Sequence, residues 1–204
     1  DRSQMTQIFI FTAGQSAARS HLDDSIISPV DLSKLEGNFL ESTGEQDNLM
    51  NRKELENFVG DKNIFCWGSM PTEKNYNTWS RMNIGDYVIC VYENRYRFIS
   101  RLKKRLNSFD LAKYIWGLDD GKTWQYMYFL TEPIPIDFHL YEISMGDSPI
   151  KGFRGFARIS DERIDFVKDK FGSLDQFIKD NFNVFITPET VSYTHLRAHE
   201  TVAN

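Results

Sequence analysis

The segment from residue 63 to residue 92 constrains the fold of this chain more than any other part. A short apolar run ends in Trp67-Gly68, and Thr72 then stands where the N-cap of a helical pattern is expected. Gly85-Asp86 follows as a turn that leads into the β-branched run 87–92. A strand, a helix and a second strand in immediate succession indicate an α+β domain.

Hydrophobic patterns along the rest of the chain predict further strands and helices. We expect strands over 8–12, 63–67, 87–92, 96–102, 123–131 and 153–159, and helices over 16–27, 50–59, 72–82, 110–115, 161–171 and 173–182. Ser16 is the expected N-cap of the first helix, and residues 28–49 are expected to form a loop with short helical turns. Pro133 and Pro135 are expected to end the aromatic strand before them. Strands dominate the middle of the chain, which predicts a curved, mostly antiparallel sheet flanked by helices.

The composition is that of a soluble globular protein with an unusual share of aromatic residues. Of the 204 residues, 41% are hydrophobic and 26% charged, which is ordinary, whereas 14% are aromatic. That share requires either a large core or a site lined by aromatic rings. No run approaches the roughly 20 apolar residues of a membrane span, and no signal peptide is recognisable. We therefore expect a cytoplasmic protein in which Cys66 and Cys90 are buried thiols.

Basic residues gather in one stretch although the net charge is −5. An acidic sum argues against a nucleic-acid partner, but phosphates meet one face of a protein, so the distribution of charge matters more. No acidic residue separates the basic side chains of this stretch, which are Arg95, Arg97, Arg101, Lys103, Lys104 and Arg105. Two interpretations stay open: a solvated hairpin with a helix start, or a patch that faces phosphates.

The order of motifs from residue 63 to about residue 160 resembles the EVE domain, a relative of the YTH and PUA folds. The order is Trp67-Gly68, Asn75-Tyr76, Trp79, Met82, then Gly85-Asp86 and a strand. The resemblance implies a PUA-like barrel that holds a flipped, modified base in an aromatic pocket. It implies one domain over 5–188, with an N-terminal extension (5–60), a core (61–160) and C-terminal helices (161–185).

The same resemblance implies a partner and a context for the domain. The partner would be DNA with a modified base, with RNA as a second possibility. EVE-like domains often stand at the N-terminus of prokaryotic modification-dependent restriction proteins, joined to a nuclease or a motor domain. A flipped base needs flat walls, polar groups for the base edge and a basic rim for the backbone.

Specific residues of this chain match the site that the resemblance implies. Trp67-Gly68-Ser69 is similar to the tryptophan and Ser-Thr pair of YTH proteins, and Trp116 is the expected second wall. Trp124 is either a third wall or a packing residue. The expected readers of the base edge are Asn75, Tyr76 and Asn77, and Arg154 is expected to meet phosphate together with the basic stretch. The alternative for each tryptophan is a place in the core, and we assign Trp79 to the core.

Catalytic motifs are missing from the sequence, which favours a binding module without cofactor or metal. Outside the last residues only His21 and His139 are histidines, and neither stands beside a recognisable nucleophile. Asp119-Asp120-Gly121 is typical of a turn. An RNA-binding PUA-like domain without modification preference and a hydrolase similar to the ASCH group remain as alternatives. The lack of a carboxylate between Trp67 and Thr72 favours N6-methyladenine over 5-methylcytosine, because a carboxylate accepts the amine of cytosine.

The last residues stand apart from the domain. Residues 191–201 resemble translated sequencing-adapter read-through, so we expect 191–204 to be a non-native tail and the natural coding sequence to be truncated near Thr190. The pair His195 and His199 has a helical metal-binding spacing, but we do not interpret it as a metal site.

Overall fold

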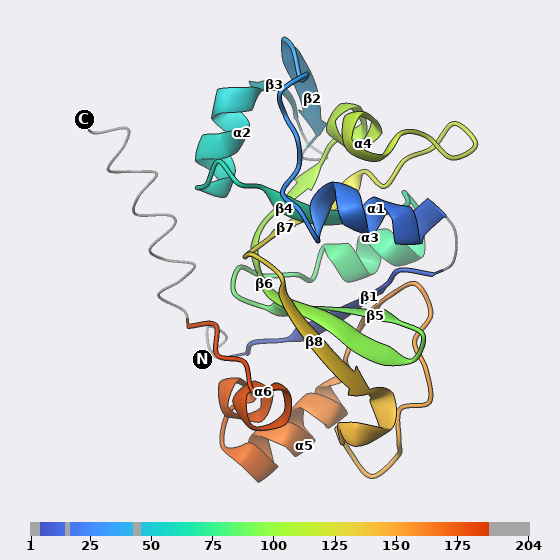
Figure 1. Cartoon of the computed structure of the whole chain (residues 1–204), viewed down its shortest axis with the longest axis vertical. Coiled ribbons are helices and arrows are strands. Elements are labelled where there is room, and N and C mark those ends of the chain that lie inside the picture. The colour runs from blue at the N-terminus through green and yellow to red at the C-terminus, as the bar shows by residue number, and fades with distance from the viewer. Residues whose placement is uncertain (1–4, 15–16, 43–45, 188–204) are drawn as a thin grey trace.

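A computed structural model describes residues 5–14, 17–42 and 46–187. Within these residues a sheet of nine strands is flanked by six α-helices, which confirms the predicted α+β class (Figure 1). The strands are β1 Ile8–Thr12, β2 Asn38–Ser42, β3 Asp47–Asn51, β4 Phe65–Ser69, β5 Tyr87–Tyr92, β6 Arg95–Asn107, β7 Tyr126–Leu130, β8 Ile134–His139 and β9 Phe156–Arg158. The helices are α1 Ala17–Ser25, α2 Arg52–Val59, α3 Glu73–Trp79, α4 Phe109–Trp116, α5 Asp161–Phe171 and α6 Leu174–Phe182.

The long strand β6 connects the two parts of the sheet. Its first half pairs with β5 and β8, and its second half pairs with β7, all antiparallel. Strand β4 adds to β7, and β1 lies parallel to β5 with β9 on its other side. A bulge between Leu102 and Lys104 marks the change of partner, where a bulge increases the local twist. The sheet is open, so the closed barrel implied by the EVE resemblance is not formed.

Three apolar clusters hold the helices against the sheet. Helices α5 and α6 cover one face near β1 and β5, where Phe177 and Ile178 are fully buried. Helices α2 and α4 pack near the β2–β3 hairpin around Leu55 and Leu111. Between them lies a central cluster that contains Phe9, Trp67 and Tyr128 from three strands, with Leu22 of α1 packed against them. Figure 1 shows the two helix pairs at opposite ends of the molecule.

Helix caps and turns that depend on neighbouring residues lie where the sequence predicts them. Strand β1 has the predicted bounds, and the hydroxyl of Thr72 accepts a hydrogen bond from the backbone of Asn75 as the N-cap of α3. Gly60 ends α2 with φ 85°, a conformation that glycine adopts without steric penalty. The carboxylate of Asp86 accepts the backbone N–H groups of Gln7 and Asn83, as expected for the turn before β5.

Two segments differ from the prediction, and several boundaries are displaced by a few residues, the end of β6 by the most. Residues 28–49 were expected to form a loop, but part of this segment forms the hairpin of β2 and β3. Strand β7 ends at Leu130, before Pro133 and Pro135, as expected, but Pro135 itself lies inside β8, a strand that was not predicted. Strand β8 pairs with β6 at the edge of the sheet, where a missing N–H is tolerated. Strand β6 runs to Asn107, five residues beyond its predicted end at residue 102. The predicted N-cap Ser16 and the tail 191–204 lie outside the described residues.

Both cysteines are buried free thiols, as predicted. In the described part of the chain, no helix has the length and apolar character that crossing a membrane requires.

Candidate functional site

Three tryptophans from separate segments meet in the structure. Trp67 lies on β4, Trp116 is the last residue of α4, and Trp124 lies in the loop before β7. The ring centres of Trp67 and Trp116 are 6.0 Å apart at 64°, and those of Trp116 and Trp124 are 6.4 Å apart at 78°. Together with His21 and Gly68 they line one small space, which we call the tryptophan pocket. The predicted walls Trp67, Trp116 and Trp124 are therefore brought together.

Two of the three rings are fixed by regular structure. Trp67 stacks on Phe11 of β1 with ring centres 5.0 Å apart, and only 6% of its surface is exposed. The indole N–H of Trp116 donates to the hydroxyl of Ser25 in α1 at 3.3 Å. Helix α4 begins at its N-cap Ser108 and ends at Gly117, which has φ 79°. These contacts give the two walls little freedom to move.

The third ring, Trp124, has weaker support. It is half-buried, and its ring meets that of His21 edge-on at 4.9 Å. His21 lies on α1, with Nδ1 3.2 Å from a carboxylate oxygen of Asp24. Next to Trp124, the hydroxyl of Thr123 is buried and has no hydrogen-bond partner among the described residues. A buried hydroxyl without a partner is unfavourable, so the side chain of Thr123 adds no hydrogen bond with the described residues that would hold the loop before β7.

The glycine at the centre of the pocket is required by its neighbours. A Cβ atom on Gly68 would lie 2.1 Å from the carbonyl oxygen of Trp124 and 3.0 Å from the ring of Trp116. The five residues leave no room among them for even a water molecule. Ligand pockets, in contrast, have volumes of roughly 300 Å³ or more. The tryptophan pocket is therefore closed, and Trp124 fills the room that a ligand would need.

The predicted polar residues are divided between two places. Ser69 is buried at the end of β4, one residue beyond Gly68 and opposite Tyr126. The side-chain amide of Asn75 donates to the carbonyl oxygen of Met70 at 3.0 Å, so it stabilises the start of α3. Tyr76 and Asn77 are exposed on α3. The structure does not place Asn75, Tyr76 or Asn77 in the lining of the tryptophan pocket.

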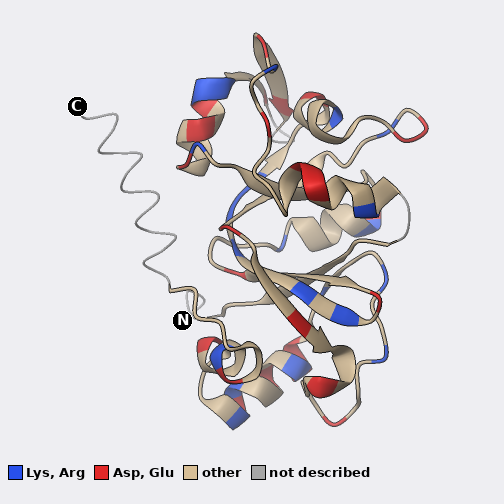
Figure 2. Cartoon of the chain, viewed as in Figure 1, with Lys and Arg blue, Asp and Glu red and all other residues tan. Residues whose placement is uncertain are grey.

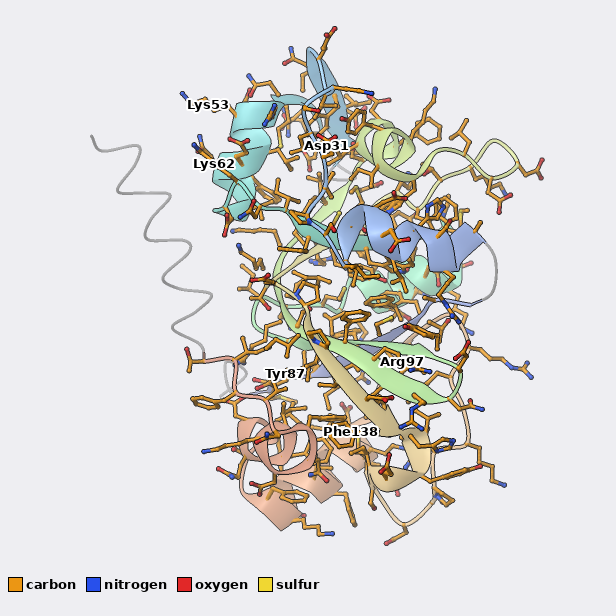
Figure 3. All side chains as sticks on the ribbon, in the orientation of Figure 1. Asp31, Lys53, Lys62, Tyr87, Arg97 and Phe138 are labelled. Carbon is orange, nitrogen blue, oxygen red and sulfur yellow. The ribbon has the colours of Figure 1, made fainter. Side chains whose placement is uncertain are left out.

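The basic residues of β6 do not form one surface, because the strand distributes them along its length (Figure 2). Near the β5–β6 hairpin, Arg95 forms an ion pair of 2.6 Å with Asp137. Arg97, labelled in Figure 3, pairs with Glu93 at 3.2 Å and also lies over the ring of Tyr92. Carboxylates already neutralise both arginines, which lowers their value as phosphate ligands.

Arg101 has a structural role in place of the predicted phosphate contact. Only 4% of its surface is exposed, and its guanidinium donates to the carbonyl oxygens of Gly85 at 2.8 Å and Ile186 at 2.7 Å. It thereby ties the segment after α6 to the turn before β5. Tyr87, labelled in Figure 3, contacts the same guanidinium and donates to a carboxylate oxygen of Asp175 at 2.6 Å. Burial raises the pKa of the Tyr87 hydroxyl above its usual range.

The remaining basic residues lie at the far end of β6 and in the loop before β9. Lys103, at the bulge, is 6% exposed, and burial lowers the pKa of its amine. The amine of Lys104 lies 5.5 Å from the ring centre of Phe58, and Arg105 lies over Trp79. Arg154 is exposed. Lys104, Arg105 and Arg154 are thus the predicted phosphate ligands that remain accessible.

His21 belongs to the pocket although its sequence pattern predicted only a packing or surface position. No local signal marks it, because its neighbour Trp124 is more than a hundred residues away along the chain. Within the described residues, no group of three or more histidine, cysteine or acidic side chains could hold a metal ion.

No protein-family model and no curated protein matches the sequence. Among solved structures, the chain is similar to the YTH domain of the Zygosaccharomyces rouxii MRB1 protein in complex with N6-methyladenosine RNA. The sequence identity is 11% and the TM-score 0.43, over 81% of this chain and 86% of that chain.

Proposed function

We propose that this domain binds nucleic acid and holds one extruded, modified nucleobase between Trp67, Trp116 and Trp124. The observation that carries the proposal is the convergence of these three rings around Gly68. A core needs packed apolar side chains, but it does not need three indoles from three separate segments beside a glycine. Stacking on an aromatic ring contributes about 1–3 kcal/mol per base, which offsets much of the unfavourable free energy of extrusion.

A base enters the pocket by displacing Trp124. The pocket is too small for a base as it stands, so one wall has to move. Trp67 and Trp116 are buried on a strand and a helix, whereas Trp124 is half-buried in a loop. After the loop shifts, the Trp124 ring can cover the base as a third wall. Ser69, an expected polar contact of the base, is buried two residues after Trp67 on the same strand but is not part of the lining of the closed pocket.

The proposal extends to the identity of the base. The residues that line the tryptophan pocket in the described part of the chain include no lysine and no carboxylate. A cytosine reader uses a carboxylate to accept the exocyclic amine, so this lining favours a methylated adenine over a methylated cytosine. An ASCH-like hydrolase would need a lysine or an acid in this place, so the lining also favours binding over catalysis.

We further propose that the natural ligand is DNA with a modified base, with RNA as the second candidate. In that case the domain is the recognition module of a larger modification-dependent restriction protein, as the EVE resemblance implies.

A panel of oligonucleotides tests the proposal. Single- and double-stranded DNA and RNA, each plain, with N6-methyladenine or with 5-methylcytosine, are titrated against the domain at one salt concentration. We expect tightest binding to the N6-methyladenine strands. Trp116→Leu should bring the affinity ratio of modified to plain strands close to one. Phe177→Leu is the matched control, because Phe177 is an equally buried aromatic residue in a different cluster.

Two results would contradict the proposal. One is a wild-type protein that binds plain and modified strands equally, with affinity set by salt and strandedness alone. That result supports the alternative of an RNA-binding or DNA-binding domain without modification preference. The other is an unchanged ratio in Trp116→Leu, which would place the modified base outside the tryptophan pocket.

A further inference from the structure

A second cavity lies beside α3, between that helix, the end of β2 and the second half of β6. Its volume is about 600 Å³, within the range of roughly 300–1,000 Å³ that is usual for ligand sites. We call it the α3 groove. Unlike the tryptophan pocket, it is already open, and its lining combines aromatic and cationic side chains.

The aromatic wall of the groove is rigid. The Trp79 ring stacks on Tyr126 with ring centres 5.3 Å apart, and its indole N–H donates to the carbonyl oxygen of Met127 at 2.9 Å. Tyr76 contacts both rings: its ring centre lies 6.0 Å from that of Trp79 and 5.7 Å from that of Tyr126. Even so, 47% of its surface is exposed. An exposed ring on a fixed aromatic base is a surface on which a planar group can stack.

The cations of the groove differ from the other basic residues of β6. Arg105 lies over the ring of Trp79, 4.8 Å from its centre, and donates to the Trp79 carbonyl oxygen at 3.2 Å. Neither Arg105 nor Lys104 forms an ion pair within the described residues, whereas Arg95 and Arg97 do. Burial lowers the pKa of Arg105, as expected for a desolvated charge without a carboxylate partner. Glu41 is the one acidic residue in the described lining.

We infer that the α3 groove binds one nucleotide of a single strand, with the base stacked on Tyr76 and the phosphate near Lys104 and Arg105. A stacking surface beside unpaired cations is the arrangement by which proteins bind single-stranded nucleic acid without reading its sequence. This inference rests on the proposed function only in taking nucleic acid as the partner.

The groove and the tryptophan pocket are connected by one short segment of chain. Trp124 belongs to the pocket and Tyr126, two residues further, supports the wall of the groove. The Cα atoms of two such residues are at most about 7 Å apart. On this inference, a strand with one base in the pocket continues to the groove, which would increase affinity for any sequence without contributing to the choice of modification.

Two substitutions test the groove, each with a matched control. Tyr76→Leu removes the stacking ring and is compared with Tyr141→Leu, since Tyr141 is 70% exposed and outside the groove. Lys104→Gln is compared with Lys62→Gln, an exposed lysine labelled in Figure 3. The probes are a plain single strand and the same strand with one N6-methyladenine, titrated over a range of salt concentrations.

We expect Tyr76→Leu to weaken the binding of both strands by about tenfold. Lys104→Gln should reduce the slope of log affinity against log salt by about 0.7, the value for one phosphate contact with a single strand. The ratio of modified to plain affinity should stay at its wild-type value in both variants, and the controls should bind like the wild type. A strand with a photoreactive 5-iodouracil should crosslink to the peptide that contains Tyr76.

The outcomes separate this inference from the proposed function. If the wild type prefers the modified strand but neither Tyr76→Leu nor Lys104→Gln changes binding, the inference about the groove is overturned and the proposal for the pocket stands. Weaker binding in both variants, in a protein without modification preference, supports the groove and overturns the pocket. A wild-type protein that binds no strand at all overturns both.

Discussion

The tryptophan pocket contains Trp124, and the wall of the α3 groove is supported by Tyr126 two residues later, yet the two sites differ in how a ligand could enter them. The tryptophan pocket leaves no room for a water molecule between its rings, whereas the groove has a volume of about 600 Å³ beside an exposed tyrosine. A base can enter the pocket only after Trp124 moves, whereas a nucleotide can enter the groove at once. On the proposed function, selectivity would reside in the pocket and general affinity in the groove, and the open groove would be occupied first.

The largest expected effect is on stability, when a buried ring of the pocket is removed and compared with an exposed ring of the groove. Trp67→Ala should lower the free energy of unfolding by about 3–5 kcal/mol, because it leaves a cavity beside Phe11. Tyr76→Ala should change it by less than about 1 kcal/mol, because its ring is half-exposed. Urea denaturation of both variants measures the difference. Equal losses of stability would contradict the distinction between a buried wall and an open surface.

Arg101 and Arg105 of β6 provide a second test, because Arg101 is buried whereas Arg105 lines the groove. Arg101→Met should lower the free energy of unfolding by about 2–3 kcal/mol, because the carbonyl oxygens of Gly85 and Ile186 lose a charged donor. Arg105→Met should be milder for stability but should weaken strand binding and its salt dependence. Denaturation and titration of both variants separate the two roles. An Arg101 variant of wild-type stability would show that the buried guanidinium does not hold the segment after α6.

The sequence predicts those features of the fold that depend on neighbouring residues. The N-cap Thr72 and the end of α2 at Gly60 each follow from local chemistry. The hairpin of β2 and β3 has weak alternation, and several of its side chains, such as Leu49, remain exposed. Contacts with distant elements, such as the bond from the backbone of Leu40 to Asp110, add to its local pairing and leave no signal in its own sequence.

The residues of the candidate site likewise fall into those that the sequence predicts and those that only distant contacts place. The three tryptophans were predicted because motif order carries them, and the structure brings them together. The basic stretch was left open as a solvated hairpin or one phosphate-facing patch, but β6 changes its partner strands at a bulge, and its basic residues meet different elements. Arg95 pairs with the carboxylate of Asp137 in β8, and Arg101 donates to the carbonyl oxygen of Ile186 after α6, both far along the chain.

Gly68 is the residue through which the closed pocket can be disturbed without removing a ring. Gly68→Ala should lower the free energy of unfolding by about 1–3 kcal/mol, because the new methyl group overlaps the Trp124 carbonyl oxygen at 2.1 Å. Gly14→Ala is the matched control, since nothing lies within 4 Å of a Cβ atom there. Urea denaturation compares the two. If Gly68→Ala is as stable as the wild type, the loop with Trp124 moves aside easily and the pocket is less firmly closed than its contacts indicate.

The smallest expected effect concerns what keeps the pocket closed before a base arrives. His21 meets the Trp124 ring edge-on at 4.9 Å, an arrangement that contributes about 0.5–1.5 kcal/mol between aromatic rings. His21→Ala weakens the closed state and should raise the affinity for a strand with N6-methyladenine by about two- to tenfold, because a larger fraction of the protein is then open. His139→Ala is the control, because its ring stacks on Tyr141 and lies outside the pocket. The binding of a plain strand should change by a smaller factor, since the groove does not depend on the position of Trp124. A lower affinity of His21→Ala for the modified strand would instead make His21 part of the wall that holds the base.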